Sequence, residues 1–140
     1  MLQETHSQAS LDQFAKLILR SFPAVKIIIL EGDLGAGKTF LIKTFLKILG
    51  VKEPVSSPTF SLVHFYNNSE GAIYAHLDLY RVLSIQEAHE AGLDEVLAGN
   101  YEKIFVEWGS RIPELFENEK KLIIQISGSG HSRLYQVNIG

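Results

Sequence analysis

The sequence predicts an α/β fold whose mixed β-sheet has a parallel centre and antiparallel edges. An apolar run at residues 26–30 leads into the glycine-rich segment GDLGAGKT and then into a helical pattern, which is the strand–loop–helix order of a parallel sheet. Two further pairs of strand-like segments are each joined by a short turn-rich sequence, which indicates antiparallel pairing. Because strand–helix units and hairpins occur in one chain, we expect both kinds of pairing in one sheet.

The composition is that of an ordinary globular domain. The 140 residues are 46% hydrophobic and 21% charged, and no repeat or linker divides them, so we expect a single domain over residues 1–140. The net charge of −3 argues against binding nucleic acid through a broad basic surface. The absence of cysteine excludes disulfides, thiolate metal sites and cysteine nucleophiles. With no signal-like N-terminus and no long apolar stretch, we expect a cytoplasmic protein.

The first helix is predicted from a capping box at residues 10–13, where Ser10 and Gln13 have the spacing of reciprocal caps. Apolar residues then recur at helical spacing, and the helix should end before Pro23. Residues 26–30 form a continuous apolar run, as in a strand that is buried on both faces. The predicted inward residues of the helix are Leu11, Phe14, Ala15 and Ile18.

The glycine-rich segment opens a second helix that stops at Gly50. Beyond it we predict an antiparallel strand pair, a short helix from Ser84 to Gly92, a strand, another short helix and a C-terminal hairpin with the turn GSG. The predicted inward side chains of the second helix are Leu41, Phe45, Ile48 and Leu49. The predicted boundaries are 60–66 and 73–80 for the pair, 104–106 for the strand, 113–116 for the later helix, and 122–127 and 134–139 for the hairpin.

The segment GDLGAGKT is the strongest chemical signal in the sequence. Gly32, Gly35 and Gly37 permit backbone conformations and close approaches that a Cβ atom obstructs. The N–H groups of such a loop surround phosphate oxygens, aided by the N-terminal dipole of the following helix. Lys38 then supplies a positive charge to the β- and γ-phosphates, and the Thr39 hydroxyl is a ligand for Mg²⁺. The segment therefore predicts nucleotide binding in a P-loop nucleotide hydrolase fold.

Two carboxylates are candidates for the hydrolytic chemistry. Asp78 in HLDLYR and Glu107 in IFVEWG each lie at or near the end of a predicted strand. Side chains at that position point into the crevice where open α/β sheets bind ligands. Either acid has the chemistry to hold Mg²⁺ or to position the attacking water, and the residues alone leave the two roles open. A solvated acid or a salt bridge is the alternative for both.

The remaining polar groups give weaker indications. The segment SSPT, which ends at Thr59, is either a nucleotide-sensing loop or an ordinary turn. The five histidines have no metal-ligand spacing, and we expect His64 and His76 to be packing or surface residues. Trp108 is most simply a core aromatic, with contact to a partner as the alternative. No guanine-reading NKxD-like segment occurs, which favours ATP over GTP.

The segments GDLGAGKT, SPTF, HLDLYR and VEWG, taken together and in order, resemble one protein family closely. The chain is similar to the small P-loop ATPases of bacterial tRNA threonylcarbamoyladenosine biosynthesis, the TsaE family. The resemblance extends from residues 5–7 to Arg133, which is nearly the whole chain. The last three motifs at these separations are far more specific than the phosphate loop alone.

The resemblance implies roles for individual residues. In this family the phosphate loop binds ATP, and the residues at the positions of Thr39 and Glu107 hold Mg²⁺. The aspartate at the position of Asp78 is needed for activity and is the candidate for orienting water. Thr59 falls in the family's switch-like loop. The implied nucleotide-binding residues are Asp33, Leu34, Gly35, Ala36, Gly37, Lys38, Thr39, Phe40, Thr59 and Arg133, and the implied catalytic residues are Lys38, Asp78 and Glu107.

The resemblance also implies a function and partners. Family members hydrolyse ATP to ADP and phosphate and work with two other proteins, a transferase subunit and its paralogous scaffold. That pair carries out threonylcarbamoylation of adenosine 37 in tRNAs reading ANN codons, and the hydrolysis resets it between turnovers. Contact of the ATPase with tRNA is expected to be indirect or weak.

Two departures and two alternatives accompany this expectation. Leu11 lies where family members often have threonine near the nucleotide, and Phe40 lies where many have a second threonine after Thr39. A small-molecule kinase with the same loop is one alternative, although the chain lacks the arginine-rich lid segment that such kinases carry. A nucleotide-dependent scaffold that hydrolyses little is the other.

Overall fold

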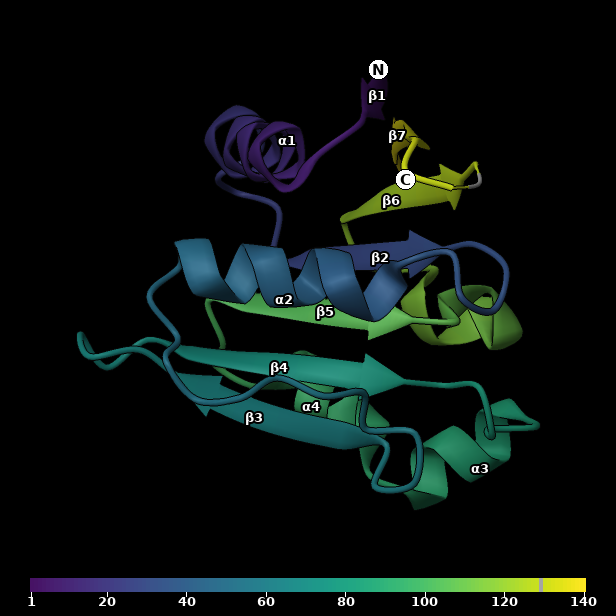
Figure 1. Cartoon of the computed structure of the whole chain (residues 1–140). Helices are drawn as coiled ribbons and strands as arrows, with labels where there is room; N and C mark the ends of the chain where they lie inside the picture. Colours follow the sequence, from purple (N-terminus) through teal and green to yellow (C-terminus); the bar gives the residue numbers. More distant parts are fainter. Residues whose placement is uncertain (129) are drawn as a thin grey trace.

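The computed structural model describes residues 1–128 and 130–140. Its strands form one seven-stranded sheet in the order β1-β7-β6-β2-β5-β4-β3 (Figure 1). The strands are β1 (Leu2–Thr5), β2 (Ile27–Glu31), β3 (Val63–Asn67), β4 (Ile73–Asp78), β5 (Lys103–Glu107), β6 (Lys121–Ser127) and β7 (Arg133–Ile139). The helices are α1 (Gln8–Ser21), α2 (Lys38–Ile48), α3 (Ile85–Glu90) and α4 (Leu93–Ala98), with 3-10 turns η1 (Gly109–Arg111) and η2 (Pro113–Phe116).

The centre of the sheet is parallel and its edges are antiparallel. Strand β2 pairs in parallel with β6 on one side and β5 on the other, and β4 continues the parallel set beside β5. Strands β7 and β1 at one edge and β3 at the other pair antiparallel with their neighbours. The predicted mixed sheet is therefore confirmed. The arrowheads of β2, β5 and β4 point to the same side, where the loop into α2 lies (Figure 1).

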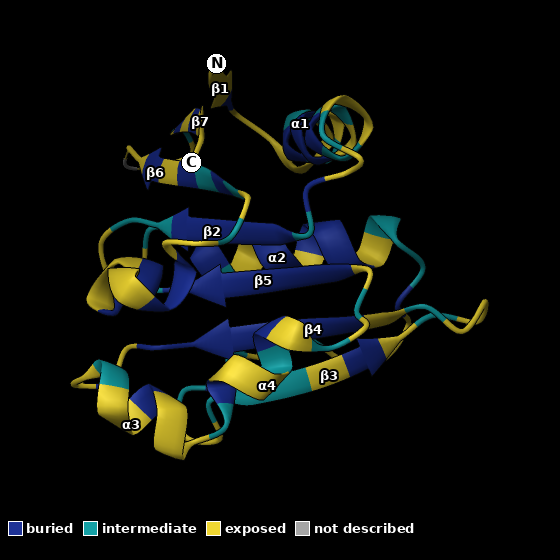
Figure 2. Cartoon of the chain, turned by 180° about the vertical axis from the view of Figure 1, so that it is seen from behind, coloured by how far each residue is buried: buried dark blue, intermediate teal, exposed yellow. Residues whose placement is uncertain are grey.

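Helices cover both faces of the sheet, and each face has its own apolar core. Helices α1 and α2 lie on one face, while α3, α4 and the 3-10 turns lie on the other (Figures 1 and 2). Along β2, Ile28 and Leu30 face the first core, whereas Ile27 and Ile29 face the second. The continuous apolar run that predicted this strand thus reflects burial of both of its faces.

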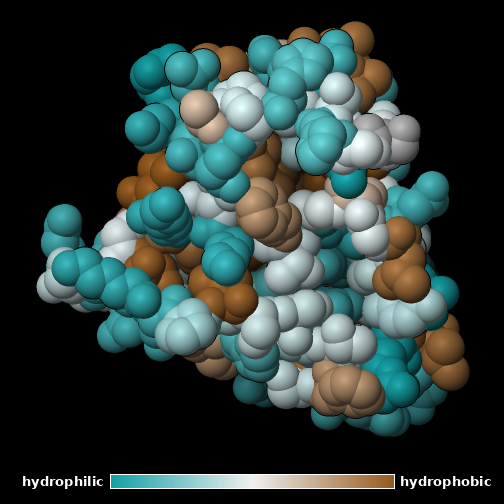
Figure 3. Space-filling view, in the orientation of Figure 1, coloured by the Kyte–Doolittle hydropathy of each residue, from teal (hydrophilic) through white to brown (hydrophobic). Residues whose placement is uncertain are grey.

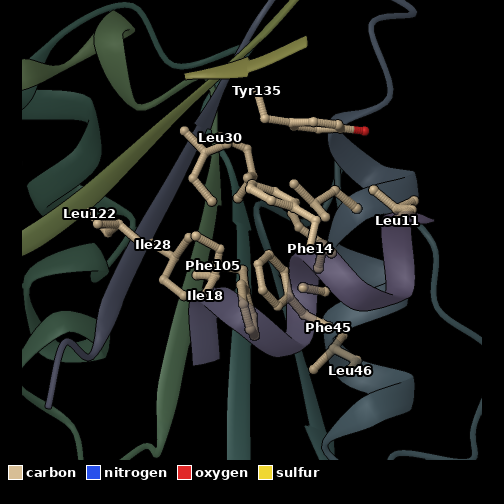
Figure 4. Close-up of a cluster of buried hydrophobic side chains, with 14 of the residues drawn as sticks. Leu11, Phe14, Ile18, Ile28, Leu30, Phe45, Leu46, Phe105, Leu122 and Tyr135 are labelled. Atoms are coloured by element: carbon tan, nitrogen blue, oxygen red, sulfur yellow. The ribbon is translucent and has the colours of Figure 1, made fainter. Parts of the chain in front are cut away.

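Aromatic rings fill the core beneath α1 and α2. Phe45 of α2 stacks on Phe105 of β5 with ring centroids 5.3 Å apart, and Phe14 of α1 stacks on Tyr135 of β7 at 4.7 Å (Figure 4). All four side chains are buried. Because α1 also packs against α2, this core connects the C-terminal hairpin to the helix that follows the glycine loop.

The first helix begins earlier than the sequence analysis predicted. Its N-cap is Ser7, whose hydroxyl accepts from the Ser10 N–H at 3.2 Å, while the Ser10 hydroxyl accepts from the Ser7 N–H at 3.0 Å. The capping box placed at residues 10–13 is therefore wrong, because Ser10 fills the position that Glu or Gln commonly occupies. The predicted inward residues are all buried, namely Leu11, Phe14, Ala15 and Ile18.

Strand β1, helix α4 and the turn η1 were not predicted from the sequence, and several strand boundaries differ by one to three residues. Strand β1 is short and mostly exposed, so it lacks an apolar alternation, and α4 begins directly after Gly92, which adopts a left-handed φ of 79° as its N-cap. Strand β3 starts at Val63 because Leu62, with φ of 70°, interrupts the extended backbone before it. Strand β4 ends at Asp78 rather than at residue 80.

The C-terminal hairpin is confirmed by the antiparallel pairing of β6 with β7. In its predicted turn GSG, Ser129 lies outside the described residues. Within residues 1–128 and 130–140, no helix combines the length and the apolar character needed to cross a membrane.

Truncation of Phe45 tests the core that supports α2. Phe45→Ala should lower the free energy of unfolding by about 3–5 kcal/mol, because it removes a fully buried ring and leaves a cavity. Phe65→Ala is the matched control: its ring is 48% exposed and stacks on Tyr101, so the loss should be about 1 kcal/mol. Urea unfolding of both variants measures the difference. Equal losses would contradict the assignment of this core.

Candidate functional site

The loop between β2 and α2 has a backbone that requires its glycines. Gly32 follows β2 with φ of 155°, and a Cβ atom there would approach the carbonyl oxygen of Ile126 to 2.8 Å and the Cβ of Ala36 to 3.0 Å. Gly35 and Gly37 have left-handed φ values of 81° and 108°, and Gly37 is the N-cap of α2. The loop therefore wraps closely over the sheet and ends at a helix N-terminus, as an anion-binding loop does.

The ammonium group of Lys38 folds back into this loop. Its Nζ donates to the carbonyl oxygens of Gly32 at 2.7 Å and Asp33 at 2.9 Å, and it lies 4.1 Å from the centroid of the Trp108 ring. The residue is only 4% exposed. This burial lowers the pKa of Lys38, against the opposing effect of nearby carboxylates, of which Glu107 is the strongest. A cation is thus held at the point where the motif predicts phosphate contact.

Thr39 and Glu107 meet at the mouth of the loop. The Thr39 hydroxyl donates to the Glu107 carboxylate, with Oγ1 lying 2.9 Å from both Oε1 and Oε2. Hydroxyl and carboxylate oxygens are the hard ligands that Mg²⁺ prefers. Among the described residues, no group of three or more acidic or histidine side chains could hold an ion. The pair fits a Mg²⁺ ion that takes its other ligands from phosphates and water.

Asp78 lies beside Glu107, because the register of β4 with β5 pairs the two residues. Its Oδ2 accepts from the Ser57 hydroxyl at 2.6 Å and from the Thr59 hydroxyl at 3.0 Å. Its Oδ1 accepts from the N–H of Tyr80 at 2.9 Å. Two hydroxyls of the SSPT segment therefore bond to a buried acid at the crevice. An ordinary surface turn would not have such contacts.

Trp108 forms a wall of the crevice. It is half-buried at the edge of the second core and has a left-handed φ of 61°. Its ring contacts the Lys38 ammonium, and its centroid lies 4.9 Å from that of the Tyr80 ring. The next turn is anchored to β2, because Ser110 donates through its N–H and its hydroxyl to the two oxygens of Glu31, at 2.7 and 2.8 Å. Trp108 is thus a site residue at the core's edge rather than a simple core aromatic.

Two cavities flank the loop and share Gly37 and Phe40. One, of about 320 Å³, has the loop lysine, Thr39, the two acids and Trp108 in its lining. The other, of about 420 Å³, is enclosed by the N-terminal segment at residues 5–8, the loop and the C-terminal hairpin. Arg133 lines it and donates from Nε to the carbonyl oxygen of Ala36 at 3.1 Å. The smaller cavity is lined by Leu34, Gly35, Gly37, Lys38, Thr39, Phe40, Asp78, Tyr80, Glu107 and Trp108.

Most of the predicted site residues converge on these two cavities. Asp33 is an exception, since it lines a third cavity beside β6, and Thr59 reaches the site through its bond to Asp78. Two polar contacts at the site were not predicted from the sequence, that of Ser57 with Asp78 and that of His76 with Glu107. His76 precedes Asp78 by two residues on one strand, so the period of two was a signal that both side chains share a face.

Comparison with known proteins identifies similar chains over most of this length. The family described as threonylcarbamoyl adenosine biosynthesis protein TsaE matches residues 5–135. A tRNA threonylcarbamoyladenosine biosynthesis protein TsaE from Rickettsia felis is 37% identical, over 87% of this chain and 77% of the relative. The protein of that name from Bacillus subtilis is 36% identical, over 81% and 70%. The crystal structure of Bacillus subtilis YdiB is similar to this structure, with a TM-score of 0.71 and 30% sequence identity. The match covers the whole of this chain and 86% of the YdiB chain.

Removal of the loop lysine tests the phosphate site. Lys38→Ala should abolish binding of ATP while the fold persists, because the ammonium group contacts loop carbonyls and a ring rather than the hydrophobic core. Lys43→Ala, at an exposed position of the same helix, is the matched control and should bind like wild type. Titration with a fluorescent ATP analogue, beside a thermal unfolding curve, measures both. A folded Lys38→Ala protein with unchanged affinity contradicts the assignment.

Proposed function

The chain belongs to the TsaE family, as its motifs predicted, and on that premise we propose that it is a Mg²⁺-dependent ATPase of tRNA threonylcarbamoyladenosine biosynthesis. The observation that carries the proposal is the convergence of Lys38, the Thr39–Glu107 pair and Asp78 on one cavity at the end of the parallel strands. The names of the relatives supply the process, and the residues supply the chemistry. We infer that the protein acts in the cytoplasm, where tRNA is modified.

Each group in the smaller cavity suits one task in phosphoryl transfer. Lys38 and the loop N–H groups offer positive charge to the β- and γ-phosphates. Thr39 and Glu107 hold Mg²⁺, which supplies charge neutralisation to the phosphates when bound. Asp78 orients the attacking water, because bonds from Ser57, Thr59 and Tyr80 fix its carboxylate while lone pairs remain on its oxygens.

The larger cavity is the proposed place for the nucleoside. It adjoins the phosphate loop through Gly37 and Phe40, so a ligand whose phosphates lie in the loop extends directly into it. Arg133 closes one wall and is fixed by its bond to Ala36. Leu11, which replaces the family's threonine, is buried in this lining and offers an apolar surface to a base.

The placement of the arginines favours weak hydrolysis by the isolated protein. The guanidinium of Arg81 lies over the Phe60 ring at 4.4 Å, and that of Arg111 lies over Tyr80 at 5.2 Å. Arg133 bonds the loop carbonyl of Ala36. No arginine occurs among the described residues that line the smaller cavity. Positive charge for the transition state beyond that of Lys38 and a bound Mg²⁺ ion must therefore come from a rearrangement or from a partner.

Exposed apolar side chains near the crevice are the proposed contacts for the two partner proteins. Phe60 is 83% exposed and adjoins Thr59, and Leu83 is 79% exposed and follows the Tyr80 segment. Leu34 of the phosphate loop is exposed as well. Hydrophobic side chains on the face drawn in Figure 3 occur in several separate groups between hydrophilic ones. Exposed apolar groups around a reaction site are typical of a surface that a partner covers.

The two acids should differ in their phenotypes. Glu107→Ala should raise the Mg²⁺ concentration needed for nucleotide binding by about tenfold or more, because the ion loses a ligand or its supporting contact. Asp78→Ala should leave binding largely intact and slow single-turnover hydrolysis by about 10²-fold or more, because orienting water matters in the transition state. Glu102→Ala, an exposed acid at the other end of β5, is the control. Swapped phenotypes would mean that the two roles are exchanged.

The partner proteins should accelerate hydrolysis. Steady-state phosphate release should be slow for the isolated chain and rise by about 10³-fold or more in the mixture with the transferase subunit and its scaffold, if they complete the charge stabilisation. Leu83→Ser should reduce the acceleration without changing the rate of the isolated chain. Ile139→Ser, equally apolar and 63% exposed on β7, should have no effect. An isolated chain as fast as the mixture would refute activation, and an unaffected Leu83→Ser would refute only the assigned contact.

A further inference from the structure

His76 is a fully buried polar side chain to which the chemistry above gives no role. It lies in the middle of β4, between β3 and β5, and has no exposed surface. Its Nε2 lies 2.7 Å from Oε2 of Glu107, whereas its Nδ1 is buried without a hydrogen-bond partner in the described part of the chain. An unpaired polar nitrogen in a protein interior costs free energy. An apolar side chain would serve packing better, so the bond to Glu107 is the feature that accounts for a histidine here.

The bond to Glu107 fixes both partners. A carboxylate oxygen only accepts hydrogen bonds, so the Nε2 atom of His76 carries a hydrogen and donates a hydrogen bond to Oε2. The Thr39 hydroxyl approaches the same carboxylate from α2. Two side chains therefore bond to this carboxylate. His76 does so from strand β4 of the sheet, and Thr39 does so from helix α2.

The hydrogen bonds of Thr39 and His76 to Glu107 would respond differently to the binding of a metal ion. Thr39 belongs to the proposed metal site, so its hydroxyl would turn from the carboxylate toward an ion held there. His76 is not part of the proposed metal site, so its bond to Oε2 of Glu107 would remain. Oε1 has the Thr39 hydroxyl as its one protein partner among the described residues, and it would become free if that hydroxyl turned away. The bond from the sheet would thus leave one oxygen of Glu107 available to an ion.

We propose that His76 is a positioning residue that holds Glu107 in the orientation that binds Mg²⁺. The proposal rests on the proposed function, since it takes Glu107 as a metal ligand. His76 touches neither phosphate nor metal and acts only through Oε2 of Glu107. A polar group that orients a metal ligand in this way commonly changes metal affinity by about 10–100-fold when it is removed.

Three substitutions separate the donor from the volume of the ring. His76→Gln places an amide N–H about as far along the side chain as Nε2, whereas His76→Asn places one near the position of Nδ1, short of Glu107. His76→Leu removes the donor and keeps an apolar side chain in the space. The readout is the Mg²⁺ concentration at half-maximal binding of a fluorescent ATP analogue, which requires no turnover. Affinity in EDTA and a thermal unfolding curve are measured for each protein.

His76→Asn and His76→Leu should raise the Mg²⁺ midpoint by about tenfold or more while affinity in EDTA is unchanged, and His76→Gln should stay close to wild type. In a Glu107→Ala background, His76→Leu should shift the midpoint no further. If His76→Leu does not fold, the comparison of Asn with Gln decides the question.

The outcomes distinguish this inference from the proposed function. A wild-type protein whose nucleotide binding ignores Mg²⁺ overturns the metal site and the role of His76 together. A Mg²⁺-dependent wild type whose midpoint no variant shifts overturns the role of His76 alone. Equal shifts in all three variants, or a shift that persists without Glu107, indicate packing and also overturn it.

Discussion

The register of three parallel strands is the constraint on which the site depends. Leu30 of β2 and Asp78 of β4 both pair with Glu107 of β5. The start of the loop after β2 and the two acids therefore lie side by side at the same edge of the sheet. Side chains alternate along a strand, and therefore Phe105 and Glu107 share a face. The stacking of Phe105 on Phe45 fixes that face toward α2. A slip of one residue would turn Glu107 into the opposite core.

Electrostatics explains why the proposed function needs a second cation in the crevice beside Lys38. Four carboxylates act on Lys38, those of Glu107, Glu31, Asp78 and Asp33. A polyphosphate adds negative charge to this acidic surrounding, and interactions among charges are strong where water is largely excluded. The single ammonium of Lys38 balances only part of that charge. In the proposed function, a divalent ion held by Thr39 and Glu107 would supply the remainder, and this would couple the binding of nucleotide to the binding of Mg²⁺ through charge.

The sequence predicted the parts of the site whose chemistry is local. The loop, Lys38 and Thr39 lie within eight consecutive residues, and Asp78 and Glu107 were found because they end apolar strands. Contacts between distant segments were not predicted. The bond of Ser57 to Asp78 spans 21 residues and that of His76 to Glu107 spans 31, and each depends on strand pairing that composition does not encode.

The resemblance to a family supplied what the residues alone did not. The bond of Arg133 to the loop spans 97 residues, and only the resemblance placed this arginine near the nucleotide. The errors in the predicted boundaries of helices and strands have local causes instead. Ser7 and Ser10 cap α1 with a serine in the usual place of Glu or Gln, and the exposed β1 has no alternation to detect.

The reactive groups of the described structure are held by one another. Lys38 bonds loop carbonyls, Thr39 bonds Glu107, and Ser57 and Thr59 bond Asp78. A nucleotide and a metal that bind as proposed would therefore replace existing hydrogen bonds rather than only add new ones, and their affinity would be the difference between the two sets. Under the proposed function, this exchange takes place close to the surface. A switch of the Thr59 hydroxyl from Asp78 to a phosphate or an ion would occur directly beside Phe60, whose exposed ring lies under the Arg81 guanidinium. A change in the γ-phosphate would then act next to an apolar ring and a cation on the surface, and a difference there would let a partner distinguish the two nucleotide states.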